Sequence, residues 1–213
     1  MFVKNQMTAN PFTATPSTTV PEAHAIMETH GVRHLPVLEN GKLVGVVSQG
    51  DIAAASPSKA TTFSVGEITY LLSKLTVGKI MTRNPHWVTP DTLLEQVAVI
   101  MRDNKIEMLP VLDDGKLVGV ITESAILDSF IDILGFRNKG TRLTIEATDA
   151  PGVLSSLTSI TARYGANITH VAVYRGHGDT STVVVGMNSL NTDAIEADLA
   201  AEGFKVIAKL QNR

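Results

Sequence analysis

The 213-residue chain has no cysteine, no excess of positive charge and no long apolar run. The lack of cysteine excludes disulfides, thiolate nucleophiles and cysteine-based zinc sites, and it favours a reducing compartment. With 18 Lys and Arg against 21 Asp and Glu, the formal net charge is -3, which argues against nucleic acid as a partner. The longest stretch without charged residues, 5–21, is rich in Thr, Asn and Pro, so no membrane span is predicted. The start of the chain has no apolar stretch suited to a secretory signal, and we expect a cytoplasmic protein.

What the chain does contain is an internal repeat. A shift of 74 residues aligns 3–52 with 77–126 without a gap, and 21 of these 50 positions are identical. The blocks M-T-x-N-P, T-P-x-T and L-P-V-L-x-x-G-K-L-V-G-V occur in both copies. A unit of this length buries too little surface to be stable alone, so we expect the two copies to pack together as one pseudo-symmetric body.

Each copy is predicted to form a β-α-β-β-α unit. Its strands flank Asn40-Gly41 in the first copy and Asp114-Gly115 in the second, residues that supply the positive φ of a tight hairpin turn. The helix before the second hairpin begins near Thr92 and Glu95, which have capping-box spacing. Between the copies, apolar residues of helical spacing predict a helix over 67–75.

The last part of the chain has a different pattern, with the order β-α-β-β-α-β that is typical of a ferredoxin-like sandwich. The segment 128–138 that leads into it contains no Pro and is predicted to continue the preceding helix. The fold class is therefore α+β. The predicted boundaries are 1–60 and 77–138 for the two repeat copies, 61–76 for the linker with its helix, and 139–213 for the last domain.

The repeated blocks, followed by Gly45-Val46-Val47-Ser48-Gln49-Gly50-Asp51, resemble a tandem pair of CBS domains, also called a Bateman module. The last segment resembles an ACT domain, through Asp149-Ala150-Pro151-Gly152-Val153-Leu154 and Gly165-Ala166-Asn167-Ile168. A CBS pair followed by one ACT domain resembles the AcuB family of acetoin utilisation proteins. This resemblance implies a regulatory protein that binds a small ligand.

The chemistry is concentrated at the end of the first hairpin. Ser48 ends a strand, and Asp51 follows in the first turn of a helix, an arrangement that suits a nucleotide because the carboxylate can accept from ribose hydroxyls while the hydroxyl and the helix start face phosphate. The CBS family uses its Gly-x-x-(Ser/Thr)-x-x-Asp motif in this way. The alternative is that Ser48 and Asp51 form a capping box and nothing else.

The second copy keeps the hydroxyl at Thr122 but has Ala125 where the first copy has Asp51, so one competent site is favoured over two. Arg33 and His34 match positions where the family often has basic residues near phosphate, whereas the second copy has Glu107. The resemblance also implies that the backbone of the first strand of the same copy contacts adenine. The predicted nucleotide-binding residues are Thr13, Ala14, Arg33, His34, Gly45, Ser48, Asp51 and Thr122.

The ACT resemblance implies an amino-acid site where a turn of one domain meets a strand of another. The matching residues are Asp149, Gly152, Asn167 and Ile168. The alternative is an ACT domain that only mediates dimers. A single ACT domain lacks the partner that the family usually pairs it with, so a homodimer is expected.

No catalytic constellation and no metal-ligand spacing occurs in the sequence, so no enzyme, no required cofactor and no metal site are predicted. The favoured function is a sensor for an adenosine ligand, of the class of AMP, ADP, ATP, S-adenosylmethionine, NAD or cyclic di-AMP. The alternative is an interaction scaffold whose clefts are empty. The regulated partner protein is not identified by the sequence.

Overall fold

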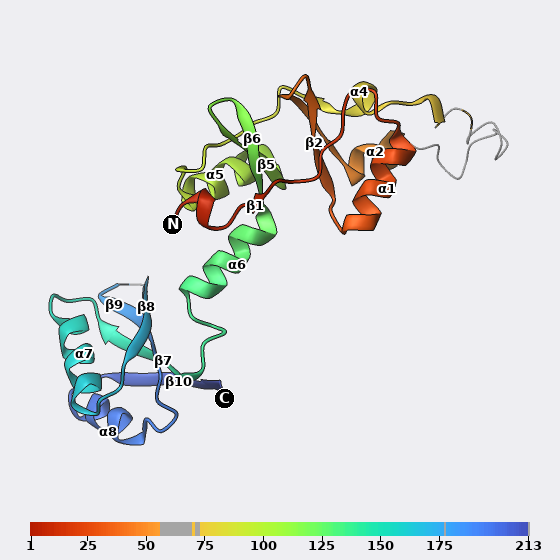
Figure 1. Ribbon diagram of the computed structural model, residues 1–213. Coiled ribbons are helices and arrows are strands. Elements are labelled where there is room, and N and C mark those ends of the chain that lie inside the picture. The colour runs from red at the N-terminus through yellow and green to blue at the C-terminus, as the bar shows by residue number, and fades with distance from the viewer. Residues whose placement is uncertain (56–69, 71–72, 177, 213) are drawn as a thin grey trace. The chain divides into compact units, whose positions relative to one another are not determined.

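The computed structural model describes residues 1–55, 70, 73–176 and 178–212 (Figure 1). The chain divides into two compact units, Met1–Ile126 and Leu127–Arg213. The first unit contains both copies of the repeat. The helix predicted over 67–75 lies largely outside the described residues. Within the described ranges, no helix is long and apolar enough to span a bilayer.

The two copies of the repeat have the same elements in the same order. In the first copy they are α1 (Val20–His30), β2 (His34–Glu39), β3 (Lys42–Ser48) and α2 (Gln49–Ala55). In the second copy they are α5 (Leu94–Asn104), β5 (Met108–Asp113), β6 (Lys116–Thr122) and α6 (Glu123–Ile133). Short helical turns at Val3–Asn5 (η1) and Val77–Ile80 (α4) precede them.

The hairpin turns confirm the prediction from Asn-Gly and Asp-Gly. Asn40 and Gly41 have φ of 50° and 77°, and Asp114 and Gly115 have 46° and 75°. Positive φ at both central residues matches the right-handed twist of the strands on either side. The strands β2 and β3 pair antiparallel, as do β5 and β6.

The first strand of each copy pairs with the other copy, which the sequence did not reveal. The strand β1 (Thr8–Ala9) adds to β6, and β4 (Thr82–Arg83) adds to β3. Further along, Ala14 makes only an isolated parallel bridge to its own hairpin at Val37. The sheets therefore have the orders β1-β6-β5 and β2-β3-β4, and each contains residues of both copies.

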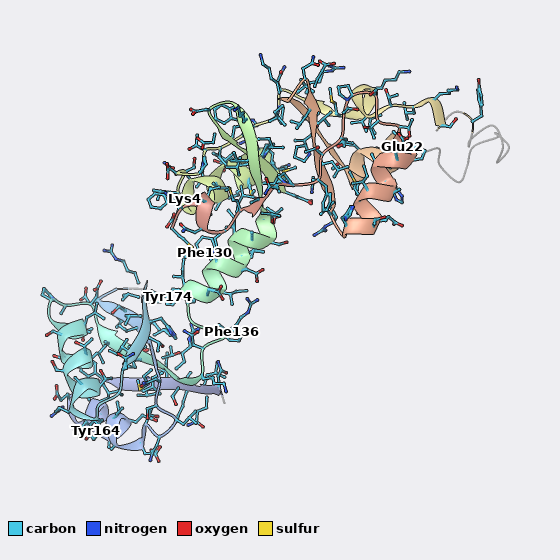
Figure 2. The ribbon with its side chains drawn as sticks, in the orientation of Figure 1. Lys4, Glu22, Phe130, Phe136, Tyr164 and Tyr174 are labelled. Carbon is cyan, nitrogen blue, oxygen red and sulfur yellow. The ribbon has the colours of Figure 1, made fainter. Side chains whose placement is uncertain are left out.

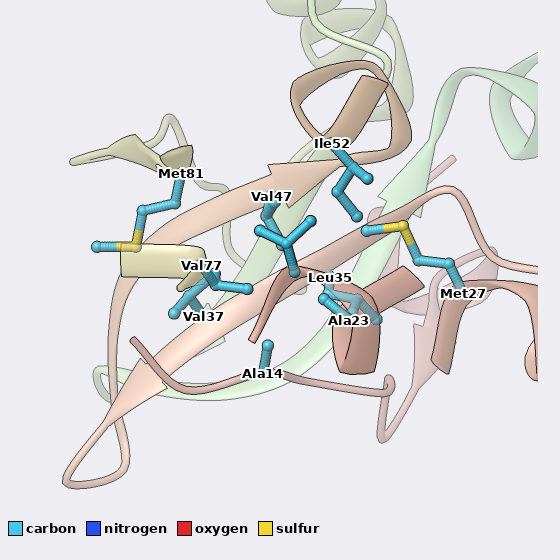
Figure 3. Packing of buried hydrophobic residues seen from close by; sticks show 10 residues of the cluster. Ala14, Ala23, Met27, Leu35, Val37, Val47, Ile52, Val77 and Met81 are labelled. Carbon is cyan, nitrogen blue, oxygen red and sulfur yellow. The ribbon is translucent and has the colours of Figure 1, made fainter. Parts of the chain in front are cut away.

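Each copy has its own apolar core between hairpin and helices. In the first copy, Leu35, Val37 and Val47 from the hairpin are fully buried against Ala23 and Met27 of α1 (Figure 3). The corresponding core of the second copy includes Val3, which is fully buried although it comes from the start of the chain. Lys4, next to it, donates a 2.7 Å hydrogen bond from Nζ to Asp91 of the second copy (Figure 2).

The second unit has a four-stranded antiparallel sheet with two helices. Its order β10-β7-β9-β8 and the sequence β-α-β-β-α-β confirm the ferredoxin-like fold. Its core contains Leu143, Ile145 and Leu157, all buried. The elements are β7 (Gly140–Thr148), α7 (Val153–Arg163), β8 (Ile168–Arg175), β9 (Thr180–Met187), α8 (Asp193–Ala201) and β10 (Lys205–Asn212).

The helix α6 crosses the boundary between the two compact units, because the second unit begins at Leu127. It ends at Ile133 and does not continue to 138. Gly135 has φ of 62° and turns the chain, and Figure 2 shows Phe130 on the helix and Phe136 after it. Asn212 of β10 donates from Nδ2 to the carbonyl of Phe136 at 2.7 Å, which holds this segment on the second unit.

Candidate functional site

Ser48 and Asp51 are joined by three hydrogen bonds at the start of α2. Ser48 donates to Asp51 Oδ2 from its backbone N–H at 2.8 Å and from Oγ at 2.7 Å, and the Asp51 N–H donates to Ser48 Oγ at 3.1 Å. This is the capping box of the alternative interpretation. Both bonds to the carboxylate fall on Oδ2, and no described residue donates to Oδ1. Asp51 can therefore cap α2 through Oδ2 and accept a hydrogen bond from a ligand through Oδ1 at the same time.

A cleft of about 620 Å³ opens at this helix start, and we call it the Asp51 cleft. The first copy contributes Ser48 and Asp51 to its lining, and the second copy contributes residues on both sides of α5. From the second copy come Thr82, Asn84, Pro85, His86 and Lys105–Met108. The exchange of first strands explains this mixture, because β4 pairs beside β3 and carries the residues after it into the cleft.

A second cleft of about 500 Å³ is related to the first by the repeat, and we call it the Thr122 cleft. Thr122, Glu123 and Ser124 stand where the first cleft has Ser48, Gln49 and Gly50. The first copy now supplies the segment after β1 and the end of α1, which bring Phe12 and His30 into the lining. Their rings stack with centroids 3.6 Å apart and planes 14° apart.

The two clefts share one wall, made of Arg33, His34, Glu107 and Met108. His34 Nε2 lies 3.8 Å from Glu107 Oε2, and the imidazole is mostly buried. Burial lowers the pKa of His34, and the charge of Arg33 lowers it further, while Glu107 and Asp51 act in the opposite direction. His34 is therefore held toward its neutral form at the point where the two clefts meet.

The structure brings together most, but not all, of the predicted nucleotide-binding residues. Arg33, His34, Ser48 and Asp51 line the Asp51 cleft, whereas Thr122 lines the other. The remaining three residues line neither cleft: Thr13, Ala14 and Gly45.

Two of these three residues, Ala14 and Gly45, have contacts within the fold that account for their absence from the clefts. The Ala14 N–H donates to Pro36 O and its carbonyl accepts from Leu38 N, so its backbone is used within its own copy. A Cβ on Gly45 would lie 2.6 Å from Met81 Sδ and 2.9 Å from Thr82 O, so this glycine makes room for β4. The place expected for the first strand of the same copy is taken by the segment after the first strand of the other copy.

The cleft residues that sequence reasoning missed are Asn84, His86 and Lys105 in one cleft and Phe12 and His30 in the other. The Asn-Pro pair that occurs in both copies was a sequence signal for a shared turn at these segments. Asn10 and Asn84, at matching positions, both have φ of 49°. Nothing in the sequence said that these segments cross to the other copy.

In the second unit, a hollow of about 300 Å³ includes Asp149, Gly152 and Val173 in its lining. The other two predicted residues lie elsewhere. The Asn167 N–H donates to Asn188 Oδ1 at 3.0 Å, and Ile168 pairs with Met187 at the start of β8. One chain therefore does not bring the four predicted residues together. Among the described residues, no cluster of His, Asp and Glu suited to a metal ion occurs.

The comparisons with known proteins agree with this architecture. The model of the CBS domain matches residues 3–58 and 77–132. The chain belongs to the CBS-domain family. The model of the ACT domain matches residues 141–204, so this CBS-domain protein carries an ACT domain after its CBS pair.

Three solved structures resemble the CBS pair. The CBS pair of protein MJ0100 in complex with 5′-methylthioadenosine and S-adenosyl-L-methionine is 32% identical, with a TM-score of 0.51 over 61% of this chain and 95% of that one. CBSX2 of Arabidopsis thaliana in complex with AMP is 34% identical, with a TM-score of 0.52 over 62% and 97%. A putative acetoin utilization protein, AcuB, from Vibrio cholerae is 31% identical, with a TM-score of 0.53 over 64% and 94%. The chain spans only 22% and 26% of the length of the first curated relatives that it matches.

Proposed function

We propose that this protein is a non-catalytic sensor that binds an adenosine-containing nucleotide in the Asp51 cleft. The observation that carries the proposal is the Asp51 carboxylate, whose Oδ2 is held by Ser48 while Oδ1 has no donor among the described residues. A fixed carboxylate with an open oxygen suits the hydroxyls of a ribose. The adenosine ligands in the solved CBS pairs of MJ0100 and CBSX2 support the same class of ligand.

The other side chains of this cleft suit the rest of a nucleotide. Arg33 and Lys105 supply positive charge for phosphate, offset in part by Glu107 of the shared wall, and Ser48 supplies a hydroxyl. The cavity of about 620 Å³ lies in the range of small-ligand sites. Binding at the junction of the two copies would change how they pack, which is how a nucleotide would act on a partner protein.

The test is substitution of the carboxylate. Asp51→Ala is expected to weaken AMP binding by about 1.5 to 3 kcal/mol, roughly a 10- to 150-fold higher Kd, because a charge-assisted hydrogen bond is lost. Isothermal titration calorimetry on the full chain measures this. The same change removes the α2 cap and is expected to lower the free energy of unfolding by about 1 kcal/mol.

Glu22→Ala is the matched control, because the Glu22 carboxylate caps α1 as the Asp51 carboxylate caps α2. Thr19 and Glu22 form the same kind of capping box at α1, with bonds of 2.8 and 3.4 Å, away from both clefts. This variant should lose similar stability and keep its AMP affinity. If Asp51→Ala also keeps its affinity, Ser48 and Asp51 form a cap only and the carboxylate does not hold the ribose. If the unaltered protein binds no adenosine ligand, the chain is an interaction scaffold.

The amino-acid site stays a prediction. Asp149 and Gly152 lie at one end of β8, near Val173, whereas Asn167 and Ile168 lie at its beginning. A site that used all four would need a second copy of the chain, in which the turn of one copy faces the strand of the other.

A further inference from the structure

Two polar side chains of the ACT sheet hold the segment 134–138, which connects α6 to β7 and which we call the α6–β7 segment. Arg142 of β7 donates from Nη1 to the carbonyl of Leu134 at 3.4 Å. Asn212 of β10 donates from Nδ2 to the carbonyl of Phe136 at 2.7 Å. A buried glycine lies between these two carbonyls in the sequence, so its backbone is held against the sheet.

The imidazole ring of His170 occupies the space that two glycines leave open. Gly186 lies opposite His170 in the neighbouring strand β9, and Gly135 belongs to the α6–β7 segment. A Cβ on either glycine would overlap the His170 ring. Gly135 also has φ of 62°, a conformation that favours glycine. The ring therefore packs directly on the backbone of both glycines and joins the α6–β7 segment to the sheet.

The hydrogen bonding of this ring suits its neutral form. Nδ1 of His170 lies 3.1 Å from Thr169 Oγ1, so a neutral ring with its proton on Nδ1 can donate to that hydroxyl. Nε2 is buried and has no hydrogen-bond partner among the residues that the structure describes. A protonated ring carries an N–H at both nitrogens, and the one at Nε2 would be a buried donor without an acceptor.

The charges around the ring also oppose a proton on it. A hollow of about 10 Å³ at His170 is lined by two charged side chains, Lys139 and Arg142, and both are cations. The strand β9 presents only the backbone of Gly186 to the ring, and β10 contributes the neutral Asn212 to the hollow. Burial lowers the pKa of His170, and the charge of Arg142 lowers it further.

The acids of α6 nearest this segment are engaged elsewhere. Asp128 and Asp132 pair with Arg137, at 2.8 and 3.7 Å from its guanidinium nitrogens. No carboxylate is among the described residues that line the hollow at His170. A positive charge on the ring would therefore have cations beside it and no anion to offset them.

We propose that His170 is a pH-sensitive switch: the neutral ring holds the α6–β7 segment on the ACT sheet, and protonation of the ring releases it. Because α6 ends at Ile133, release would free this end of the helix from the sheet. The hold is present at neutral pH and is lost as the pH falls, since the released ring binds the proton more readily. The inference does not depend on nucleotide binding in the CBS pair.

The experiment is amide hydrogen exchange of the full chain, followed by NMR. The amides of Gly135, Phe136 and Asn138 each donate to a carbonyl within 131–135, so their protection reports on the α6–β7 segment. From about pH 7.5 to about pH 5, their protection factors are expected to fall roughly threefold or more. The amide of Val185, in the inner strand β9, should keep its protection. The ring protons of His170 should titrate with a pKa below the usual 6.5.

Two substitutions separate protonation from packing. His170→Phe keeps a flat ring and cannot bind a proton, so the α6–β7 segment should stay protected at both pH values. Gly135→Ala places a methyl group in the space of the ring, so protection should already be low at neutral pH and the pKa of His170 should return toward its usual value. Gly165→Ala is the control, because Gly165 has a similar φ of 65° and nothing within 4 Å of the added Cβ.

Four results would overturn the inference. The first is an ordinary pKa of His170 in the unaltered protein, and the second is protection of the α6–β7 segment that does not change with pH. The third is the same loss of protection in acid for His170→Phe as for the unaltered protein. The fourth is a Gly135→Ala protein that behaves like Gly165→Ala, which keeps the His170 hold and should respond to pH as the unaltered chain does.

Discussion

At the residue scale, His34 is the side chain that both clefts have in common. Its pKa is lowered below the usual 6.5, chiefly by burial, so the folded protein binds a proton at His34 less readily than the unfolded chain. The stability that this contributes is present above the unfolded pKa and is lost as the pH falls through the folded one. Acidification from about pH 7 to about pH 5 therefore destabilises the fold through this residue.

The repeat suggests the variant that tests this. Met108 occupies the position of His34 in the second copy and is buried there. In His34→Met, the free energy of unfolding should fall less steeply over the same pH range, measured by urea denaturation at several pH values. Parallel pH profiles for the two proteins would show that His34 is not responsible. His170, whose pKa is also lowered by burial, is present in both proteins.

Residue-level prediction succeeded where the chemistry is local. Two such features depend only on residues close in sequence: the capping box of Ser48 and Asp51, and the positive φ of Asn40 and Gly41. The capping box predicted at Thr92 and Glu95 was wrong by one residue. Thr92 Oγ1 instead accepts from the Thr89 N–H at 3.1 Å, and the helix begins after Leu93. The repeated T-P-x-T closes a turn before the helix, and spacing alone did not distinguish this turn from a cap.

At the element scale, the short strands β1 and β4 join the copies through glycine. Gly45 lies opposite Arg83 of β4, and a Cβ there would meet backbone as well as the Met81 side chain. Gly45→Ala is expected to lower the free energy of unfolding by about 1 to 3 kcal/mol, because β4 must move away from β3. Thermal or urea denaturation of the full chain measures this.

Gly50→Ala is the paired control. It lies in α2, and the added methyl group would have nothing closer than Ser48 Oγ at 3.5 Å. This change should stabilise the protein by about 0.5 to 1 kcal/mol, since alanine loses less backbone freedom in a helix. Equal destabilisation by both changes would mean that the effect at Gly45 is not contact with β4.

The helices, the hairpins and their order were predictable because the periodicity of apolar residues and the choice of turn residues depend on residues that are close in sequence. The exchange of first strands was not. Pairing of Thr8 with Val120 depends on the packing of two whole copies, and a two-residue strand has no period of its own. This is also why the sequence did not place Asn84 and His86, which follow β4, in the cleft beside Asp51.

At the scale of the whole molecule, assembly stays a prediction. The edge strand β8 has Val171 and Val173 exposed by 42% and 50%, beside Leu154 of α7, which is 44% exposed. Apolar side chains along an unpaired sheet edge favour pairing with a second copy. Light scattering is expected to give about twice the chain mass of 22.8 kDa.

Two lysine variants test whether the dimer forms through the β8 edge. Val173→Lys should shift the protein toward the monomer, because it places a charge at the apolar edge. Leu210→Lys, on the opposite edge strand β10 and 42% exposed, should not. A monomer at micromolar concentration in the unaltered protein would count against the dimer and against an amino-acid site shared between chains.

The exchanged strands also order events during synthesis. Thr8 and Ala9 leave the ribosome well before their partners in β6, Val120 and Gly119. Over a hundred residues must therefore be translated before the first strand can pair, and a contact so distant in sequence slows folding. A nascent chain that stops before β6 can form the sheet β2-β3-β4 but not the sheet β1-β6-β5, so the sheet that contains the earlier strand β1 is the one completed last.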